Sequence, residues 1–191
     1  MALLEATIDC VAQDGYAQAT TRRIAARAHV TPGALQHHFA SKTELVGETL
    51  RYLLARFAED MLTQEQPGAV AANARNEALL DRMWQLHRGP LFQAGLELLV
   101  AARTDPELRE HLLDAQGEIS DWIEVGGPLY PELATRHAFA QLVMTSQAAM
   151  SGLAMLGLAD EALADAAWSV TRKHLLALSE QLMPSAGGAR R

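Results

Sequence analysis

The chain has 191 residues and a net charge of −7, and 49% of its residues are hydrophobic whereas only 5% are aromatic. A chain of this length can bury the core of one or two small domains, and its abundant Ala and Leu favour helix over sheet. The single cysteine, Cys10, excludes an internal disulfide framework. With no secretion signal at Leu3-Leu4 and no apolar run near the ~20 residues of a membrane span, we expect an all-α, cytoplasmic protein without a membrane partner.

The first predicted element is a helix from about Ala2 to Asp14, with Gly15 just past its end, where glycine is favoured. A second, short helix begins after Thr20, whose side-chain oxygen can accept a backbone N–H. A third begins after Thr31, with Pro32 in the first helical position, where its missing N–H is not needed. The pattern predicts two short helices joined by a tight turn.

The turn between them is expected at His29-Val30, with the Val30 side chain buried in the core. On the third helix Leu35 and Phe39 are four residues apart and would face the core. The outer face would then be formed by Gly33, Ala34, Gln36, His37 and His38. Ser41 is expected to cap a long helix over about Thr43 to Gln64, with Glu44 in the capping-box position.

This region is cationic although the whole chain is acidic. From Gly15 to Thr43 there is no Asp or Glu, and the window holds Arg22, Arg23, Arg27, Lys42 and three histidines. Nucleic acid is the natural partner of such a window, because phosphate contacts supply most of the binding energy. A helix-turn-helix places the N-terminal half of its second helix in the major groove.

The rest of the chain also reads as helical. Breaks are predicted at Gln66-Pro67-Gly68 and from Gly126 to Pro131. Between and after them we expect helices over Ala69–His87, Leu91–Arg103, Asp105 (a cap) to Val125, Ala134–Leu158 and Glu161–Leu182. The domains are then residues 1–46, with the helix-turn-helix, residues 47–184, and a disordered tail at residues 185–191.

Three segments carry a family resemblance in matching order and spacing: LLEATIDCVAQDGY from Leu3, TTRRIAARAHVT from Thr20 and GALQHHFASKTEL from Gly33. Together they resemble the DNA-binding domain of the TetR/AcrR family of transcriptional regulators. The resemblance implies an all-α fold in which a three-helix DNA-binding domain precedes a helical domain for effector binding and dimerisation. It also implies a homodimer on a palindromic operator of double-stranded DNA.

The resemblance assigns roles to single positions. Thr20, Thr21, His38 and Lys42 match phosphate-contacting positions. Arg22 matches a position that reads a guanine edge in some members, and arginine is the best bidentate donor for that edge. Gln36 stands where the family most often has tyrosine, so it could instead pair with adenine. The remaining predicted DNA contacts are Thr31, Gly33, Ala34 and His37.

The resemblance further implies a cavity for a small hydrophobic effector among the middle helices. Its candidate lining residues are Met61, Trp84, His87, Phe92, Leu96, Leu99, Trp122, Met144, Gln147 and Met150. The last two helices are apolar on more than one side and so need partners on more than one side. The residues expected at the dimer interface are Phe139, Leu142, Gly152, Leu153, Leu163, Val170, Leu175 and Leu178.

An enzyme is the competing class. The sequence has no H-E-x-x-H, C-x-x-C or G-x-S-x-G motif, and the adjacent His37 and His38 would point about 100° apart on a helix. We therefore expect no catalytic residue, no metal and no cofactor. The predicted function is a DNA-binding regulator, a repressor released from its operator by a small apolar ligand. The alternative is a helical protein-interaction module without specific DNA binding.

Overall fold

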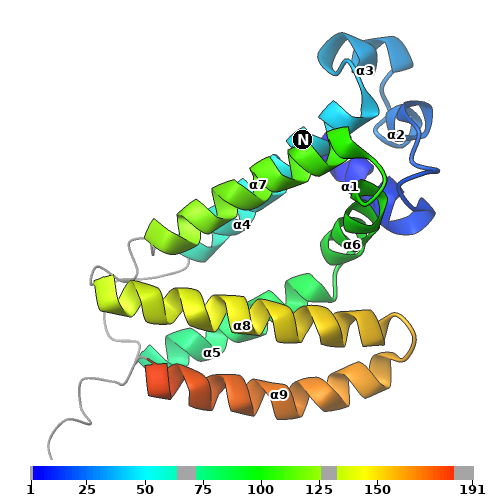
Figure 1. The fold of residues 1–191 in the computed structure, drawn as a ribbon. Helices are drawn as coiled ribbons and strands as arrows, with labels where there is room; N and C mark the ends of the chain where they lie inside the picture. The colour runs from blue at the N-terminus through cyan, green and yellow to red at the C-terminus, as the bar shows by residue number, and fades with distance from the viewer. Residues whose placement is uncertain (1, 64–71, 126–132, 183–191) are drawn as a thin grey trace, which may run out of the picture. The chain divides into compact units, whose positions relative to one another are not determined.

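The computed structural model describes residues 2–63, 72–125 and 133–182, without the side chains of some positions near the ends of these ranges (Figure 1). Its described regular elements are all helices, as predicted. They are α1 (Ala2–Asp14), α2 (Thr21–Arg27), α3 (Pro32–His38), α4 (Lys42–Thr63), α5 (Ala72–His87), α6 (Pro90–Ala102), α7 (Pro106–Val125), α8 (Leu133–Gly157) and α9 (Glu161–Leu182). The breaks predicted at 66–68 and 126–131 and the tail lie outside the described residues.

The helices form two compact units. Unit 1 comprises Met1–Glu59 and Gly89–Ile119, and unit 2 comprises Asp60–Arg88 and Ser120–Arg191. In unit 1, α6 packs against α1 although their first residues, Pro90 and Ala2, are 88 positions apart in the chain. The boundary predicted after residue 46 separates a DNA-binding domain from an effector-binding domain, whereas the two units are defined by how compactly they pack. That domain boundary stays a prediction.

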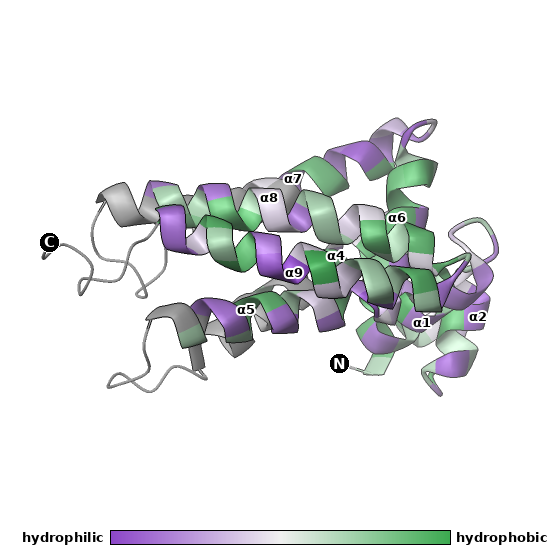
Figure 2. Cartoon of the chain, turned by 90° about the horizontal axis from the view of Figure 1, so that it is seen from below, coloured by the Kyte–Doolittle hydropathy of each residue, from purple (hydrophilic) through white to green (hydrophobic). Residues whose placement is uncertain are grey.

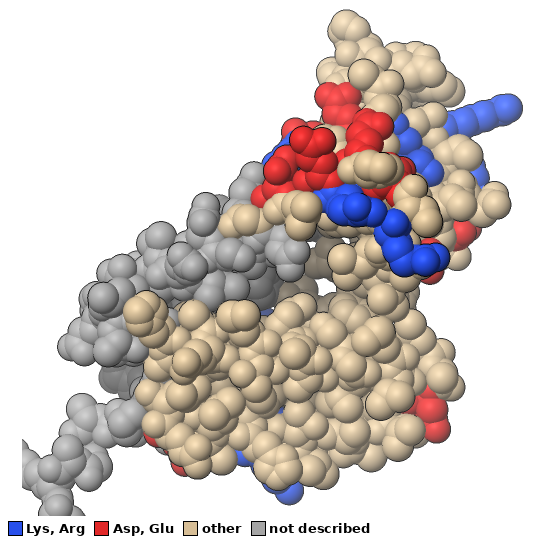
Figure 3. Space-filling model, viewed as in Figure 1, with Lys and Arg blue, Asp and Glu red and all other residues tan. Residues whose placement is uncertain are grey.

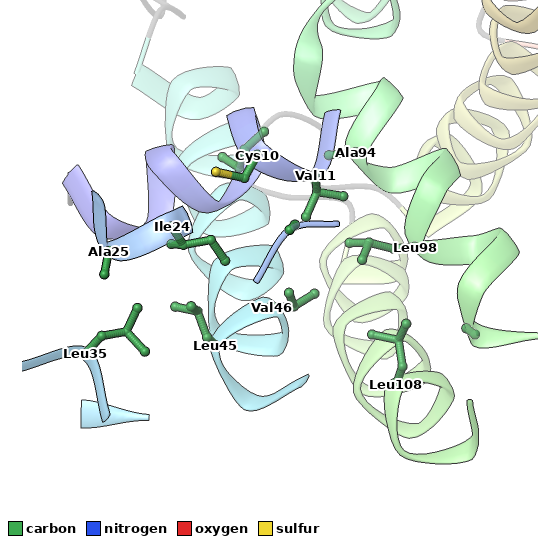
Figure 4. Close-up of a cluster of buried hydrophobic side chains, with 13 residues drawn as sticks. Cys10, Val11, Ile24, Ala25, Leu35, Leu45, Val46, Ala94, Leu98 and Leu108 are labelled. Atoms are coloured by element: carbon green, nitrogen blue, oxygen red, sulfur yellow. The ribbon is translucent and has the colours of Figure 1, made fainter. Parts of the chain in front are cut away.

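The core of unit 1 joins the three short N-terminal helices to α4, α6 and α7. Ile24, Leu35 and Leu45 are at most 1% exposed and lie together where α2, α3 and α4 meet (Figure 4). Cys10 belongs to the same cluster, and burial raises the pKa of its thiol, as expected for a structural cysteine. This packing holds α2 and α3 in a fixed relation to each other.

Local signals set the ends of the short helices as predicted. The Thr20 Oγ1 atom accepts a hydrogen bond from the Arg23 N–H at 3.3 Å, and Thr31 Oγ1 accepts one from the Ala34 N–H at 3.1 Å. Gly15 ends α1 with a φ of +76°, in the left-handed region. A Cβ there would also lie 3.1 Å from Glu97 Oε2, so both conformation and space favour glycine.

The prediction that Val30 is buried is wrong, because its side chain is 38% exposed. The turn is built by the backbone instead. The Val30 N–H donates to the Ala25 carbonyl, and the N–H of His29, at a φ of +57°, donates to the Ala26 carbonyl. These two bonds form a Schellman motif, which closes α2 without burial of the Val30 side chain.

The start of α4 is closed by two reciprocal hydrogen bonds of the capping-box type. Ser41 Oγ accepts a hydrogen bond from the Glu44 N–H at 3.0 Å, and the Glu44 carboxylate accepts one from the Ala40 N–H at 2.6 Å. Further along α4, a Cβ on Gly47 would lie 3.0 Å from the ring of His111 on α7. The glycine thus lets α7 approach the α4 backbone closely.

Unit 2 contains α5, α8 and α9, and each of these helices contacts the other two. Narrow hydrophobic and hydrophilic bands alternate along α5 and α9, as in amphipathic helices (Figure 2). The Trp84 ring stacks on Trp168 at a centroid distance of 4.9 Å. Arg172 on α9 also pairs with Asp81 and Glu77 on α5, at 2.6 and 2.7 Å. Ring stacking and ion pairs therefore both join α5 to α9.

The expectation that no segment could span a membrane needs a correction. By length and composition alone, α8 is long and apolar enough to cross one. The stretch His137–Gly157 reaches a mean hydropathy of 1.2. Phe139, Leu142 and Met150 on this helix are at most 1% exposed, because they pack inside unit 2. Packing within unit 2 thus explains one face of this apolar helix, whereas only 28% of the stretch is buried.

Candidate nucleic-acid interface

The outer face of α3 is open, as predicted. Gly33, Ala34, Gln36, His37 and His38 are all exposed, whereas Leu35 on the opposite face is 1% exposed. A Cβ on Gly33 would meet no atom within 4 Å. The first turn of α3 therefore leaves room for another backbone, such as that of DNA, to pass close by.

The three arginines of α2 differ in their partners. Arg23 forms an ion pair with Asp14 at 3.2 Å, and Arg27 donates a hydrogen bond of 2.8 Å to the Gln13 side chain. The exposed Arg22 has no hydrogen-bond or ion-pair partner among the residues that the structure describes. In Figure 3, Lys and Arg residues, drawn in blue, lie on the surface of unit 1 together with Asp and Glu residues, drawn in red. Of these arginines, Arg22 is the one ready to bind an external acceptor.

Lys42 has a structural contact that the sequence did not predict. Its ammonium group donates a hydrogen bond of 2.7 Å to the Tyr16 carbonyl and lies 3.6 Å from the centroid of the Tyr16 ring. Burial lowers the pKa of Lys42, and the nearby Asp105 carboxylate opposes that shift. Burial raises the pKa of Tyr16, and a hydrogen bond with the Thr43 side chain partly offsets that rise. Lys42 thus ties the start of α4 to the loop after α1.

The paired histidines do not form a metal site. The rings of His37 and His38 are 5.5 Å apart at 61°, in an edge-to-face arrangement. Among the described residues, no group of three or more His, Cys, Asp or Glu side chains could hold a metal ion. The histidines are therefore available as donors or acceptors on the surface of α3.

These features match a known family. Residues 3–49 match the model described as "Bacterial regulatory proteins, tetR family". An uncharacterised HTH-type transcriptional regulator of Mycobacterium tuberculosis is 34% identical over 118 residues, 62% of this chain and 60% of the relative. The N-terminal segment of the chain is thus similar to the DNA-binding segment of the TetR family. The match with this first relative spans less than two thirds of that protein's length.

Other transcriptional regulators are also similar to this chain in sequence or in fold. The HTH-type transcriptional repressor AcnR of Corynebacterium diphtheriae is 31% identical over 62% of this chain and 58% of its own. A transcriptional regulator from Rhodococcus sp. superposes with a TM-score of 0.64 at 25% identity, over 95% of this chain and 94% of its own. FadR from Bacillus subtilis, solved in complex with stearoyl-CoA, has a TM-score of 0.59 at 18% identity over 95% and 94% of the two chains. The TetR-type fold therefore extends over nearly the whole chain.

The candidate effector residues are divided between the two units. Trp84, His87 and Met150 are buried in unit 2, where Met144 and Gln147 are exposed. Phe92 and Leu96 are half-buried and Leu99 is exposed, all in unit 1. The side chains of Met61 and Trp122 lie outside the described residues. The role of this set stays a prediction.

Two hollows in unit 1 involve other residues. The larger is an open hollow of about 570 Å³, lined by Tyr16, Ala17, Glu97, Val100, Ala101, Thr104, Asp105 and Pro106. The smaller, of about 10 Å³, lies between α1, α4 and α6. None of the candidate effector residues with a described side chain lines either hollow.

The candidate dimer residues separate into a buried and an exposed set. Phe139, Leu142 and Leu175 are at most 4% exposed, so they belong to the core of the protomer. Leu163 and Val170 are 52% and 55% exposed. Gly152, Leu153 and Leu178 are half-buried.

The sequence analysis did not assign several apolar side chains to this exposed side. Met144 and Met155 are 69% and 47% exposed and, with Ala148 and Gly152, follow one face of α8 at helical spacing. Leu163, Ala166, Val170 and Ala177 do the same on α9. We call these eight residues the α8–α9 face. The surface over α8 and α9 is broadly uncharged in Figure 3, with charged atoms near its edges.

Proposed function

We propose that this protein is a sequence-specific DNA-binding transcriptional regulator, a repressor that binds a palindromic operator as a homodimer. The observation that carries the proposal is the open face of α3, which is held by capped turns. The exposed Arg22 on α2, which has no partner among the described residues, adds to it. A helix held in this way can enter the major groove and present side chains to base edges. Relatives named as transcriptional regulators and as a repressor support the proposal.

The α8–α9 face supports the dimer. Monomeric soluble proteins rarely expose apolar patches larger than a few hundred Å², and this face presents Met144, Met155, Leu163 and Val170 to solvent in the protomer. A two-fold partner would cover it and give the symmetric pair of reading heads that a palindrome requires. A spacing of about 34 Å, one turn of B-DNA, or somewhat more would suit two half-sites.

A small apolar effector is the proposed signal for release. Support comes from the Met- and Trp-bearing middle helices and from FadR, a protein of the same fold solved with stearoyl-CoA. By linkage, such an effector must weaken operator binding by the same factor by which operator weakens effector binding. Calorimetric titration of stearoyl-CoA and other hydrophobic compounds, with and without operator, tests this. A ligand of unit 2 with equal affinities in both titrations would contradict the effector role.

Titration with duplex DNA over a range of salt concentrations tests the proposed function against a helical protein-interaction module. A DNA-binding protein loses affinity steeply as salt rises, because each neutralised phosphate releases counterions. A protein-interaction module would show no salt-dependent binding. We expect a negative slope with random duplex, and a tighter complex with the true operator.

A further inference from the structure

The proposed reading head carries an unusual concentration of histidine. Three of the chain's seven histidines, His29, His37 and His38, lie within ten residues, and all three are exposed. His37 and His38 lie side by side at the end of α3, with their rings 5.5 Å apart. Imidazole is the side chain that ordinarily changes charge between pH 5 and 8.

The charged groups on the helices next to α3 are mostly cationic. The helix packed against α3 is α2, and its charged groups are Arg22, Arg23 and Arg27. At the start of α4 the charged groups are Lys42 and Glu44. The Glu44 carboxylate is engaged by the Ala40 N–H, and Asp14, at the end of α1, is paired with Arg23. No carboxylate is hydrogen-bonded or ion-paired to His37 or His38 among the described residues.

DNA at this surface would act on the exposed histidines of α3. A DNA phosphate beside His37 or His38 would favour the protonated imidazole, because it pairs with the imidazolium. The DNA complex therefore binds more protons than the free protein.

We propose that His37 and His38 couple operator binding to pH, so that the protein takes up protons when it binds DNA and binds more tightly as pH falls from 8 to 6. This inference rests on the proposed DNA-binding function and adds a second input to it. The slope of log affinity against pH equals the number of protons taken up. An average uptake of half a proton per dimer over two pH units would raise affinity about tenfold, and four histidines per dimer can contribute.

The test is operator affinity at pH 6, 7 and 8 at constant ionic strength, using a fluorescent duplex selected from a random pool. Wild type should bind about tenfold more tightly at pH 6 than at pH 8, and its salt slope should be steeper at pH 6. The double variant H37Q/H38Q keeps polar side chains but cannot gain the protons. Its affinity should change by less than about threefold over the same range.

His29→Asn is the matched control, since asparagine tolerates the left-handed conformation of residue 29. It removes a nearby exposed histidine that is not on α3, and it should retain the wild-type pH dependence. If the double variant keeps the full pH dependence, or if His29→Asn abolishes it, the proposal is wrong. Specific binding that does not change with pH in wild type would contradict the proposal alone. No specific binding at any pH would contradict the DNA-binding function as well.

Discussion

The ammonium group of Lys42 lies 3.6 Å from the centre of the Tyr16 ring and donates a hydrogen bond of 2.7 Å to the Tyr16 carbonyl. One lysine thus bonds the loop between α1 and α2 to the first turn of α4, across 26 positions of sequence. An ammonium group has three donors, so a lysine held in this way can still offer a proton to a phosphate. The position combines a structural contact with the proposed DNA contact.

Lys42→Ala should therefore have two separable effects. Losing the cation–π contact and the charged hydrogen bond should lower the free energy of unfolding by about 1–2 kcal/mol. Loss of a phosphate contact should weaken all DNA sequences alike and reduce the magnitude of the salt slope by about one per subunit. Urea denaturation and DNA titrations measure the two effects. A destabilised variant with an unchanged salt slope would assign Lys42 a structural role only.

Base reading should depend on Arg22 and Gln36. Replacing either by Ala should cost about 1–3 kcal/mol on the best operator and relax the preference at one position per half-site. Arg27→Ala is the matched control, because Arg27 is also an exposed α2 arginine but is bonded to Gln13. It should leave the selected motif unchanged. The same motif and affinity in Arg22→Ala as in wild type would remove Arg22 from the base-reading residues.

The α8–α9 face predicts the outcome of Gly152→Glu. A Cβ at Gly152 meets no atom within 4 Å in the protomer, so the variant should fold. At a subunit contact, however, glutamate adds bulk and an unpaired charge, which should yield monomers and abolish tight operator binding. Gly117→Glu, at an equally open helical glycine of unit 1, is the control. Sedimentation at micromolar concentration decides, and a wild-type monomer of 20.7 kDa would contradict the dimer.

Stability should depend on pH through His87. Burial lowers the pKa of His87, and hydrogen bonds with the Met83 backbone and the Gln147 side chain offset only part of that shift. At low pH the unfolded chain therefore binds more protons than the folded one. The stability that comes from burying neutral His87 is fully present above the ordinary histidine pKa of about 6.5, and it is lost as pH falls below that value. His87→Gln should lose less stability than wild type between pH 7.5 and 5.5. Equal losses in urea denaturation would contradict the assignment.

The parts of the fold that depend on neighbours in the chain could be predicted from the sequence. Thr20 and Thr31 cap their helices and Gly15 ends α1 because these signals act within a few residues. The exposed face of α3 followed from the spacing of Leu35 and Phe39. Val30 was misjudged because backbone bonds, which any residue can make, close that turn.

Contacts between distant segments could not be predicted in this way. The Lys42–Tyr16 contact and the Trp84–Trp168 stack join segments whose relative placement no local pattern specifies. Periodicity likewise identified α8 and α9 as apolar on several sides. It could not show that Phe139 faces the core of the protomer while Met144 faces solvent, because both faces are hydrophobic.

The central claim is that two copies of this chain read a symmetric DNA sequence through α3. The most direct test is selection of bound sequences from a random duplex pool, followed by footprinting of the product. The account predicts enrichment of a two-fold symmetric motif with half-sites about one helical turn apart, or somewhat more. A pool that shows no enrichment after repeated rounds, or a single asymmetric site bound by one protomer, would contradict it.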